Sequence, residues 1–323
     1  EIDATGLRIV PGFVDLQCNG GFGIDLTAEP ERLWELAALL PRTGVTAWLP
    51  TIVTGPPDVR ARALAALRSG PPPALAGVPL AVPLGLHLEG PFLNPLRRGA
   101  HRLRWLRPLP TPPGAGDDAL AEEVAGWSAE AGVRLVTLAP ELPGALDLVR
   151  ELPERGVVVS AGHTSATAAE AEAAIDAGVR YVTHLFNAMA PLHHREPGLA
   201  GVALGDGRVA VGVIADGIHV DARMVRLAAG ALGRRLSLVT DAVAAMGSAP
   251  GEATLGDARV RSGGDGVRLA DGTLAGSTLT LDRAVRAAMA MAGLGLAEAV
   301  AAATSVPASV MGESERGSVA VGA

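Results

Sequence analysis

The chain has 323 residues, of which 49% are hydrophobic and 3% aromatic, and its formal charge is −7. This length suits a single barrel-sized domain with insertions, and the negative charge argues against nucleic acid as the main partner. All 27 basic residues are Arg, which excludes any catalytic or carbamylated Lys, and the single cysteine, Cys18, excludes an intrachain disulfide.

Strand-like runs alternate with Ala-rich helical runs along the chain. We predict strands near 8–17, 45–53, 80–88, 133–138, 157–162, 179–184, 209–215 and 235–240. We predict helices near 29–43, 57–69, 117–131, 143–155, 166–177, 221–233, 280–292 and 296–304. Several helical runs end in a Gly-Val step, as in Thr43-Gly44-Val45, where Gly caps the helix and Val begins the strand. Eight strands alternating with helices predict an α/β protein, a (β/α)8 barrel of the TIM type.

Three segments interrupt this alternation. Residues 92–114 are rich in Arg, Pro and Leu, and residues 186–208 have no regular pattern. Residues 250–276 combine Gly-rich turns with short alternating runs, which predicts a β-hairpin excursion after the eighth strand. Because long loops within a compact domain are often functional, we expect all three to border the site.

Four residues with metal-binding or proton-transfer chemistry each follow a separate strand: Glu89, His163, His184 and Asp241. Any one of them alone is as well explained by strand capping or a satisfied polar contact. Barrels of this kind build their sites at the carboxyl ends of the strands, so together they favour a shared site. Glu89, His163 and His184 would hold one divalent metal and leave a coordination position open for water, with Asp241 as the base.

The first strand carries Gln17 and Asn19 where two-metal hydrolases of this type often have two histidines. Neutral amides are poor Zn²⁺ ligands, so we expect one metal ion, Zn²⁺ first and Fe²⁺, Co²⁺ or Mn²⁺ as alternatives. His87, two residues before Glu89, is either a partner behind the ligands or a buried packing residue.

Further residues are candidates for substrate contact. His219 ends the seventh strand, His101 lies in a basic loop, and the Leu274-Ala275-Gly276 turn offers backbone amides. Arg195, in the loop after His184, suits phosphate recognition through its planar fork of donors.

Eight motifs together carry a resemblance to a known family. They are HLEGPFLN at 87–94, RRGAH at 97–101, GHTSAT at 162–167, THLFNAM at 183–189, REPGLAG at 195–201, ADGIHVD at 215–221, LVTDA at 238–242 and DGTLAGS at 271–277. In this order and spacing they resemble the N-acetylglucosamine-6-phosphate deacetylases of the amidohydrolase superfamily. The resemblance extends from about residue 11 to Val306-Pro307-Ala308.

The resemblance implies release of acetate from N-acetyl-D-glucosamine 6-phosphate. It implies metal ligation by Glu89, His163 and His184, and Asp241 as the general base and then acid. It also implies a substrate pocket formed by Ala100, His101, Asn187, Ala188, Arg195, Asp216, Gly217, Ile218, His219, Leu274, Ala275 and Gly276.

By the same resemblance we expect a homodimer that acts on a phosphosugar, in which Arg195 reaches the neighbouring subunit's site. The single cysteine fits a reducing compartment, so we expect a cytoplasmic protein. Because no apolar stretch of about 18 residues appears, we expect no membrane span. The family also carries a small β-sandwich domain formed by residues on both sides of the barrel, and we expect most of it to be missing from this chain. Open alternatives are an N-acetylgalactosamine-6-phosphate deacetylase, another amidohydrolase, or a non-catalytic scaffold with this barrel.

Overall fold

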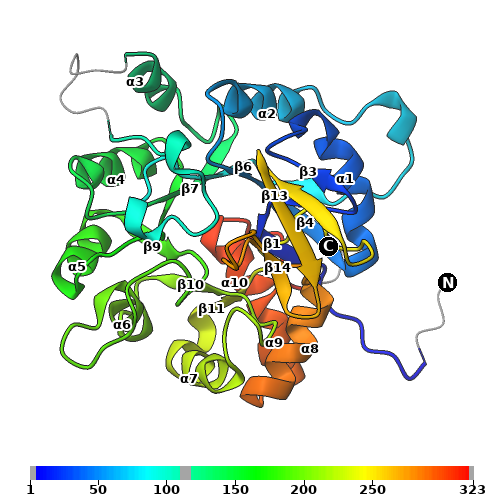
Figure 1. The fold of residues 1–323 in the computed structure, drawn as a ribbon. Helices are drawn as coiled ribbons and strands as arrows, with labels where there is room; N and C mark the ends of the chain where they lie inside the picture. The colour runs from blue at the N-terminus through cyan, green and yellow to red at the C-terminus, as the bar shows by residue number, and fades with distance from the viewer. Residues whose placement is uncertain (1–4, 110–117, 320–323) are drawn as a thin grey trace.

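Eight parallel strands form the wall of the molecule in the computed structural model, which describes residues 5–109 and 118–319. They are β1 (Phe13–Cys18), β4 (Val45–Val53), β6 (Leu86–Glu89), β7 (Val133–Leu138), β8 (Val158–Ala161), β9 (Val179–Val182), β10 (Ala210–Val213) and β11 (Leu236–Leu238). Each pairs with the next in chain order. A parallel bridge between Cys18 and Ala242 brings the end of β1 beside the segment after β11 and closes the ring. The predicted (β/α)8 barrel is confirmed (Figure 1).

The predicted strand near 80–88 is divided into two. β5 (Val82–Pro83) pairs with β4, and β6 begins only at Leu86. Pro83 lacks a backbone N–H, and Gly85 has a φ of 125°, so an uninterrupted strand cannot form here. The first predicted strand likewise begins later than expected, at Phe13, after Pro11 and Gly12.

Helices surround the barrel. They are α1 (Leu33–Leu39), α2 (Asp58–Arg68), α3 (Asp118–Ala125), α4 (Ala145–Glu154), α5 (Ala168–Ala177), α6 (Gly198–Gly205), α7 (Ala222–Leu232), α8 (Leu281–Ala292), α9 (Leu296–Ala302) and α10 (Ser305–Val310). Before β4, the predicted Gly cap is present: Gly44 has a φ of 81° and closes the turn that starts the strand. In the part of the chain that the structure describes, no helix has the length and apolar character needed to cross a bilayer.

Two helices were not predicted. α6 lies inside the segment 186–208, which we expected to be irregular, and α10 follows the last predicted helix. α6 contains three glycines, which lower its intrinsic helix propensity, but it buries Leu199, Ala200 and Ala203 against the barrel. Tertiary packing therefore outweighs local propensity at this point. The predicted loop beyond residue 109 and the predicted helical residue 117 lie outside the described residues.

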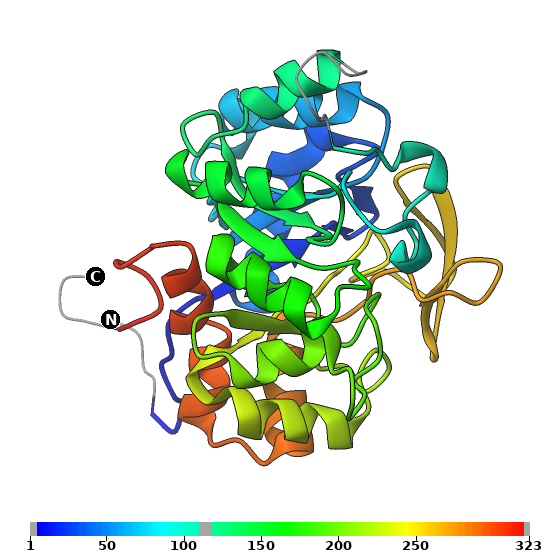
Figure 2. The same ribbon diagram turned by 90° about the vertical axis from the view of Figure 1, so that its left-hand side faces the viewer.

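The segment 250–276 holds three antiparallel strands rather than a two-stranded hairpin: β12 (Glu252–Leu255), β13 (Ala258–Gly263) and β14 (Gly266–Arg268). A further two-stranded pair, β2 (Gly20–Gly21) and β3 (Ile24–Asp25), follows β1. Figure 2 shows the three-stranded sheet at one end of the barrel and the first and last described segments of the chain at the other. The sheet therefore lies over the carboxyl ends of the barrel strands.

Asp15 is a buried carboxylate that joins β1 to the end of β11. It accepts hydrogen bonds from the Thr240 hydroxyl at 2.6 Å and from the backbone N–H of Gln17 at 3.2 Å. Burial raises the pKa of Asp15 from its ordinary 3.8 to about 7. The protonated form is thus favoured in the folded state, and the folded protein holds this proton over a pH range in which the unfolded chain has released it.

This shift predicts that stability falls as the pH rises. Asp15 stabilises the fold fully below pH 4, and this contribution is lost as the pH rises to about 7. In urea unfolding with a chelator present, Asp15→Asn should show a shallower loss of unfolding free energy between pH 4.5 and 8 than the wild type. The exposed Asp147→Asn variant is the control and should keep the wild-type slope. Identical slopes for all three proteins would contradict the prediction.

Candidate functional site

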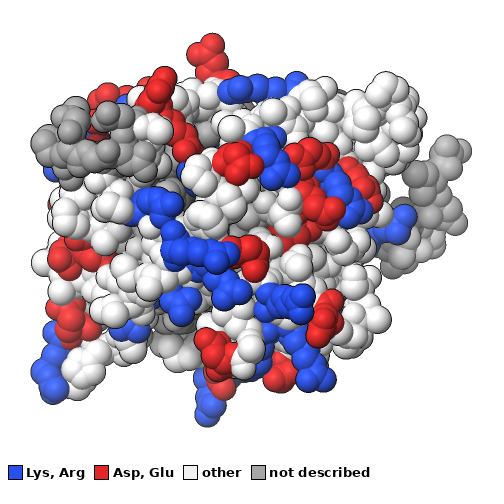
Figure 3. Space-filling view, turned by 45° about the horizontal axis from the view of Figure 1, so that its top comes forward, with Lys and Arg blue, Asp and Glu red and all other residues white. Residues whose placement is uncertain are grey.

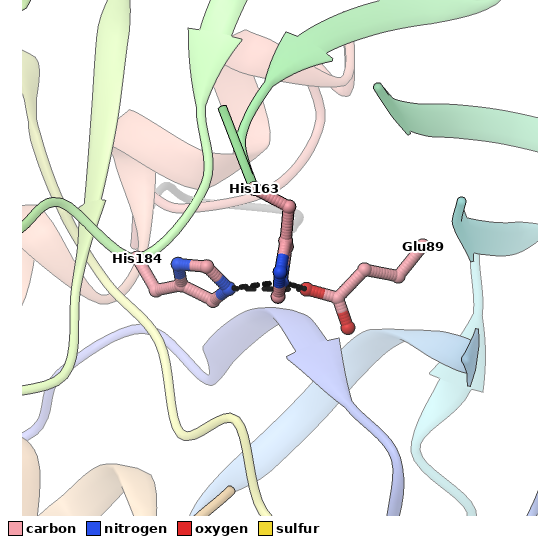
Figure 4. A group of neighbouring side chains, drawn as sticks. All are labelled: Glu89, His163 and His184. Atoms are coloured by element: carbon pink, nitrogen blue, oxygen red, sulfur yellow. Dashed lines mark hydrogen bonds and ion pairs between the residues drawn. The ribbon is translucent and has the colours of Figure 1, made fainter. Parts of the chain in front are cut away.

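Glu89, His163 and His184 converge at the carboxyl ends of β6, β8 and β9 (Figure 4). The Nε2 atoms of His163 and His184 each lie 3.1 Å from Glu89 Oε1 and 3.0 Å from each other. All three side chains are buried, and one ligand atom from each lies within 4.8 Å of the other two. Two imidazole nitrogens directed at one carboxylate oxygen form a donor set suited to a divalent cation.

The electrostatics of the cluster combine an ionised carboxylate with a neutral imidazole. Burial acts to raise the pKa of Glu89, but the neighbouring imidazoles of His101, His163 and His184 lower it well below its usual range. Burial, reinforced by the charge of His101, lowers the pKa of His163 to about 4 and keeps this imidazole neutral. Burial also acts to lower the pKa of His184, but Glu89 reverses this effect and raises it. An ionised carboxylate thus attracts a cation to a place where a neutral imidazole can act as a ligand.

The tautomer of His163 is set by the backbone. Its Nδ1 lies 2.9 Å from the carbonyl oxygen of Arg97, which can only accept, so Nδ1 carries the proton. The Nε2 lone pair is therefore free to point into the cluster. Within the described part of the chain, Nδ1 of His184 has no such hydrogen-bond partner.

The backbone at these positions is unusual. His163, His184 and Asp241 have φ values of 49°, 30° and 47°, in the left-handed region that residues other than Gly rarely adopt. Such conformations cost on the order of 1–3 kcal/mol each and persist only where the surroundings impose them. Here the flanking chain is held by hydrogen bonds, such as that from the backbone N–H of Asp241 to the Gln17 carbonyl at 2.9 Å.

Asp241 lies beside the cluster and is linked to it by two amides from the first strand. Gln17 Nε2 donates to Glu89 Oε1 at 2.9 Å and to Asp241 Oδ1 at 3.2 Å, and Asn19 Nδ2 donates to Asp241 Oδ1 at 2.7 Å. Burial and the negative charge of Glu89 raise the pKa of Asp241 to about 6. A carboxylate with that pKa can accept and return a proton near neutral pH.

These residues line a cavity of about 190 Å³. Of the predicted site residues, eleven line it: Glu89, Ala100, His101, His163, His184, Asn187, Ala188, His219, Asp241, Leu274 and Gly276. Asp216, Gly217, Ile218, Ala275 and Arg195 do not. Arg195 is exposed and contacts His194. Among the described residues, no arginine lines the cavity.

Two of the lining histidines are oriented by neighbours. Asp216 accepts from the backbone N–H of His219 at 2.8 Å and contacts its Nδ1 at 2.7 Å, which leaves Nε2 of His219 for a ligand. Burial acts to raise the pKa of Asp216, but the hydrogen bonds from His219 lower it below its ordinary value. His101 Nδ1 lies 2.8 Å from the Thr54 hydroxyl, with its Nε2 3.7 Å from Glu89 Oε2. Asp216 and Thr54 thus do not line the cavity themselves but fix the orientation of the His219 and His101 imidazoles that do.

The cavity also includes Asn19, whose amide is described above, and four residues that we did not predict: Val53, Gly99, Thr273 and Leu255. Gly99 and Thr273 lie inside the RRGAH and DGTLAGS motifs, directly before predicted residues, and could have been found there. Val53 and Leu255 carried no signal, because an apolar residue at a strand end looks like any core residue. Leu255 reaches the site only because β12 folds back over the barrel.

The structure distinguishes the two interpretations of His87, a partner behind the ligands or a buried packing residue. It is fully buried, with Nε2 2.8 Å from the Thr137 hydroxyl and Nδ1 3.2 Å from the Leu16 carbonyl. Burial lowers its pKa to about 4, so it remains neutral. His87 is a hydrogen-bonded residue of the barrel interior, below the cluster.

Comparisons of the chain with a family model and with known proteins all find similarity to the same kind of protein. The model of the amidohydrolase family matches residues 8–323. An N-acetylglucosamine-6-phosphate deacetylase of Danio rerio is 39% identical, over 98% of this chain and 78% of that protein. An N-acetylgalactosamine-6-phosphate deacetylase of Escherichia coli O157:H7 is 38% identical, over 94% of this chain and 78% of that protein.

A solved structure extends the comparison to the fold. It is a mutant N-acetyl-D-glucosamine-6-phosphate deacetylase from Mycobacterium smegmatis in complex with N-acetyl-D-glucosamine-6-phosphate. It is similar to this chain with a TM-score of 0.81 and 38% identity, over 94% of this chain and 77% of that one.

The cluster geometry predicts that His163→Ala lowers the affinity for divalent ions. Losing even an outer partner of a ligand costs about 10–100-fold in metal affinity, so loss of a ligand should cost more than about 100-fold. Competition with a chelator, using Zn²⁺ or Co²⁺, measures the effect. The control is His193→Ala, an exposed histidine in the loop after β9 that is not part of the cluster. Equal affinities for His163→Ala and the wild type would mean that the ion binds elsewhere.

Proposed function

The chain belongs to the amidohydrolase family, and we propose that it hydrolyses the acetamide of N-acetyl-D-glucosamine 6-phosphate to glucosamine 6-phosphate and acetate. The observation that carries the proposal is the convergence of Glu89, His163 and His184 beside Asp241 in one cavity. A non-catalytic scaffold would need neither the left-handed backbone at these residues nor a buried ionised cluster.

We propose that Glu89, His163 and His184 hold a single divalent ion, Zn²⁺ first among the candidates. Imidazole and carboxylate suit first-row divalent metals, and the inward-facing amide nitrogens of Gln17 and Asn19 donate to carboxylates and so cannot serve as ligands of a second ion. When bound, such an ion supplies Lewis-acid polarisation of the acetamide carbonyl and lowers the pKa of water.

Asp241 would perform both proton transfers. As the carboxylate it accepts the proton of the attacking water, and as the acid it passes that proton to the leaving nitrogen when the C–N bond breaks. Its raised pKa suits both roles, since the proton is bound and released near neutral pH. Asn19 and Gln17 hold its Oδ1, which leaves Oδ2 for the water.

Substrate recognition would fall to the polar walls of the cavity. His101, His219 and Asn187 present polar side-chain atoms to a sugar phosphate, and Asp216 and Thr54 orient the two imidazoles. Arg side chains gather near the middle of the face drawn in Figure 3, among Asp and Glu. The loop after β6 contains five arginines, at 97, 98, 102, 104 and 107. Such a local positive field would attract an anionic substrate despite the net negative charge.

The galacto epimer is the second candidate, because the Escherichia coli relative named for it is nearly as similar as the Danio rerio relative named for the gluco epimer. An assay of acetate release from the two epimeric 6-phosphates tests the function and the epimer preference together. We expect faster release from the gluco substrate. Release from neither epimer would exclude the proposed function, and faster release from the galacto epimer would reassign the substrate.

We further propose a homodimer in which Arg195 binds the phosphate of a substrate held by the other subunit. Arg195 is exposed and does not line the cavity of its own chain, and none of the described residues that line it is an arginine that could bind a dianionic phosphate. A planar guanidinium is well suited to bidentate binding of that group.

Replacing the base tests the proton-transfer role. Asp241→Asn should reduce kcat by about 10²–10⁴-fold, the usual contribution of one acid–base group. Asn tolerates the left-handed backbone at this position, so metal content and melting temperature should remain near wild type. Single-turnover acetate release together with elemental analysis checks both expectations. A variant that retained more than about a tenth of wild-type kcat would reassign the base.

Replacing the arginine tests phosphate recognition. Arg195→Ala should lower kcat/KM for the phosphorylated substrate by about 10–150-fold, the loss expected for a charge-assisted bidentate contact of 1.5–3 kcal/mol. Activity on unphosphorylated N-acetylglucosamine should change little. The neighbouring His194→Ala variant is the control. Equal losses on both substrates would show that Arg195 does not read the phosphate.

A mixed dimer separates action within one chain from action across the interface. If Arg195 serves the partner's site, an equal mixture of Arg195→Ala and Asp241→Asn chains regains about a quarter of wild-type activity, because half of the dimers then hold one complete site. No gain over the separate variants would contradict the shared site.

A further inference from the structure

Glu141, in the loop between β7 and α4, is a half-buried carboxylate that the reaction described above does not use. Its Oε1 accepts from the side-chain amide of Asn94 at 2.8 Å and from the backbone N–H of Ser165 at 2.6 Å. Its Oε2 accepts from the hydroxyl of Thr164. One side chain thus joins the loops that follow β6, β7 and β8.

The first of these contacts leads to the imidazole of His163. The backbone N–H of Asn94 donates to the carbonyl of His163 at 2.9 Å, and Asn94 Oδ1 caps the short 3-10 helix Pro95–Arg97 by accepting from Leu96 N–H at 2.8 Å. That helix ends at Arg97, whose carbonyl accepts the Nδ1 proton of His163. By holding Asn94, Glu141 keeps in place the carbonyl that selects the His163 tautomer.

The other contacts lead to the backbone of His163. Thr164 and Ser165 directly follow this histidine, whose φ of 49° is strained. Arg97 Nε also donates to the Ser165 hydroxyl at 3.0 Å, which ties the capped helix to the same turn. Glu141 therefore holds both the ring acceptor and the chain that follows the ligand.

We propose that Glu141 is a positioning residue for the metal site: it sets metal affinity by fixing the orientation and tautomer of His163, without touching the ion or the substrate. The inference rests on the proposed metal site at Glu89, His163 and His184. Outer partners of metal-ligating histidines typically contribute 10–100-fold to affinity, and Glu141 would act one step further out, on two such contacts at once.

The test compares metal affinity with stability. Glu141→Ala should weaken Zn²⁺ binding about 10–100-fold in chelator competition, and Glu141→Gln, which keeps one acceptor oxygen, should weaken it less. The matched control is Glu123→Ala, another half-buried carboxylate, which is paired with Arg60 between α2 and α3. It should lower the melting temperature of the metal-free protein and leave the affinity within about twofold of wild type.

Two further readouts distinguish positioning from general destabilisation. The Co²⁺-loaded Glu141→Ala protein should show an altered visible d–d spectrum, because the orientation of one ligand has changed, whereas Glu123→Ala should match the wild type. In a His163→Ala background, adding Glu141→Ala should cause no further loss of affinity, since the residue through which it acts is already absent.

The outcomes separate this inference from the metal site itself. Wild-type affinity and spectrum in Glu141→Ala, with a large loss in His163→Ala, would overturn the role of Glu141 and leave the metal site standing. If the wild type bound no metal, or if His163→Ala bound it normally, both would fall. If Glu141→Ala does not fold, the Glu141→Gln variant decides by the same measurements.

Discussion

The buried negative charge of Glu89 is the constraint around which the site is arranged. An isolated carboxylate inside a protein is strongly unfavourable, so it must be paired and hydrogen-bonded. Its Oε1 meets Gln17 Nε2 and the two imidazoles at 2.9–3.1 Å, and these groups come from the ends of β1, β8 and β9. Burial together with the same charge raises the pKa of Asp241, and the charge of Glu89 raises the pKa of His184 against the effect of burial. The Glu89 carboxylate thus links the ends of four barrel strands, β1, β6, β8 and β9. It also affects the protonation of the titratable groups around it.

Pairing the charge of Glu89 requires backbone conformations that these residues would not adopt without the surrounding structure. The left-handed φ values of His163, His184 and Asp241 direct the side chains inward as each strand turns into its loop. Closure of the barrel between β1 and the segment after β11 holds one of these turns, and the hydrogen bonds of the loops after β6 and β7 hold another. The strain is therefore supported by the barrel and its loops together.

The three-stranded sheet gives the cavity one apolar wall. A small hydrophobic cluster, separate from the main core, contains Val53, Val243, Ala245, Leu255, Val260, Val267 and Ala275. Two of its members, Val53 and Leu255, also line the cavity. Asp257, in the turn between β12 and β13, pairs with Arg102 and Arg104 of the loop after β6. The barrel thus supplies the polar cluster, and the sheet shapes the space in front of it.

The sequence alone determined the barrel and the polar cluster, because both follow from local signals. Strand periodicity and Gly caps located the eight strands, and parallel strands place their carboxyl ends at one face, which brought Glu89, His163, His184 and Asp241 together. The alternation could not reveal α6, whose glycines lower its helix propensity, or the break at Pro83 and Gly85. The strand and helix pattern also gives no sign that Leu255 lines the cavity or that hydrogen bonds link Glu141 to His163. Nor does it show that Arg195 lies outside the cavity of its own chain. Each of these depends on how loops distant in sequence pack against one another, and only the tertiary structure decides that.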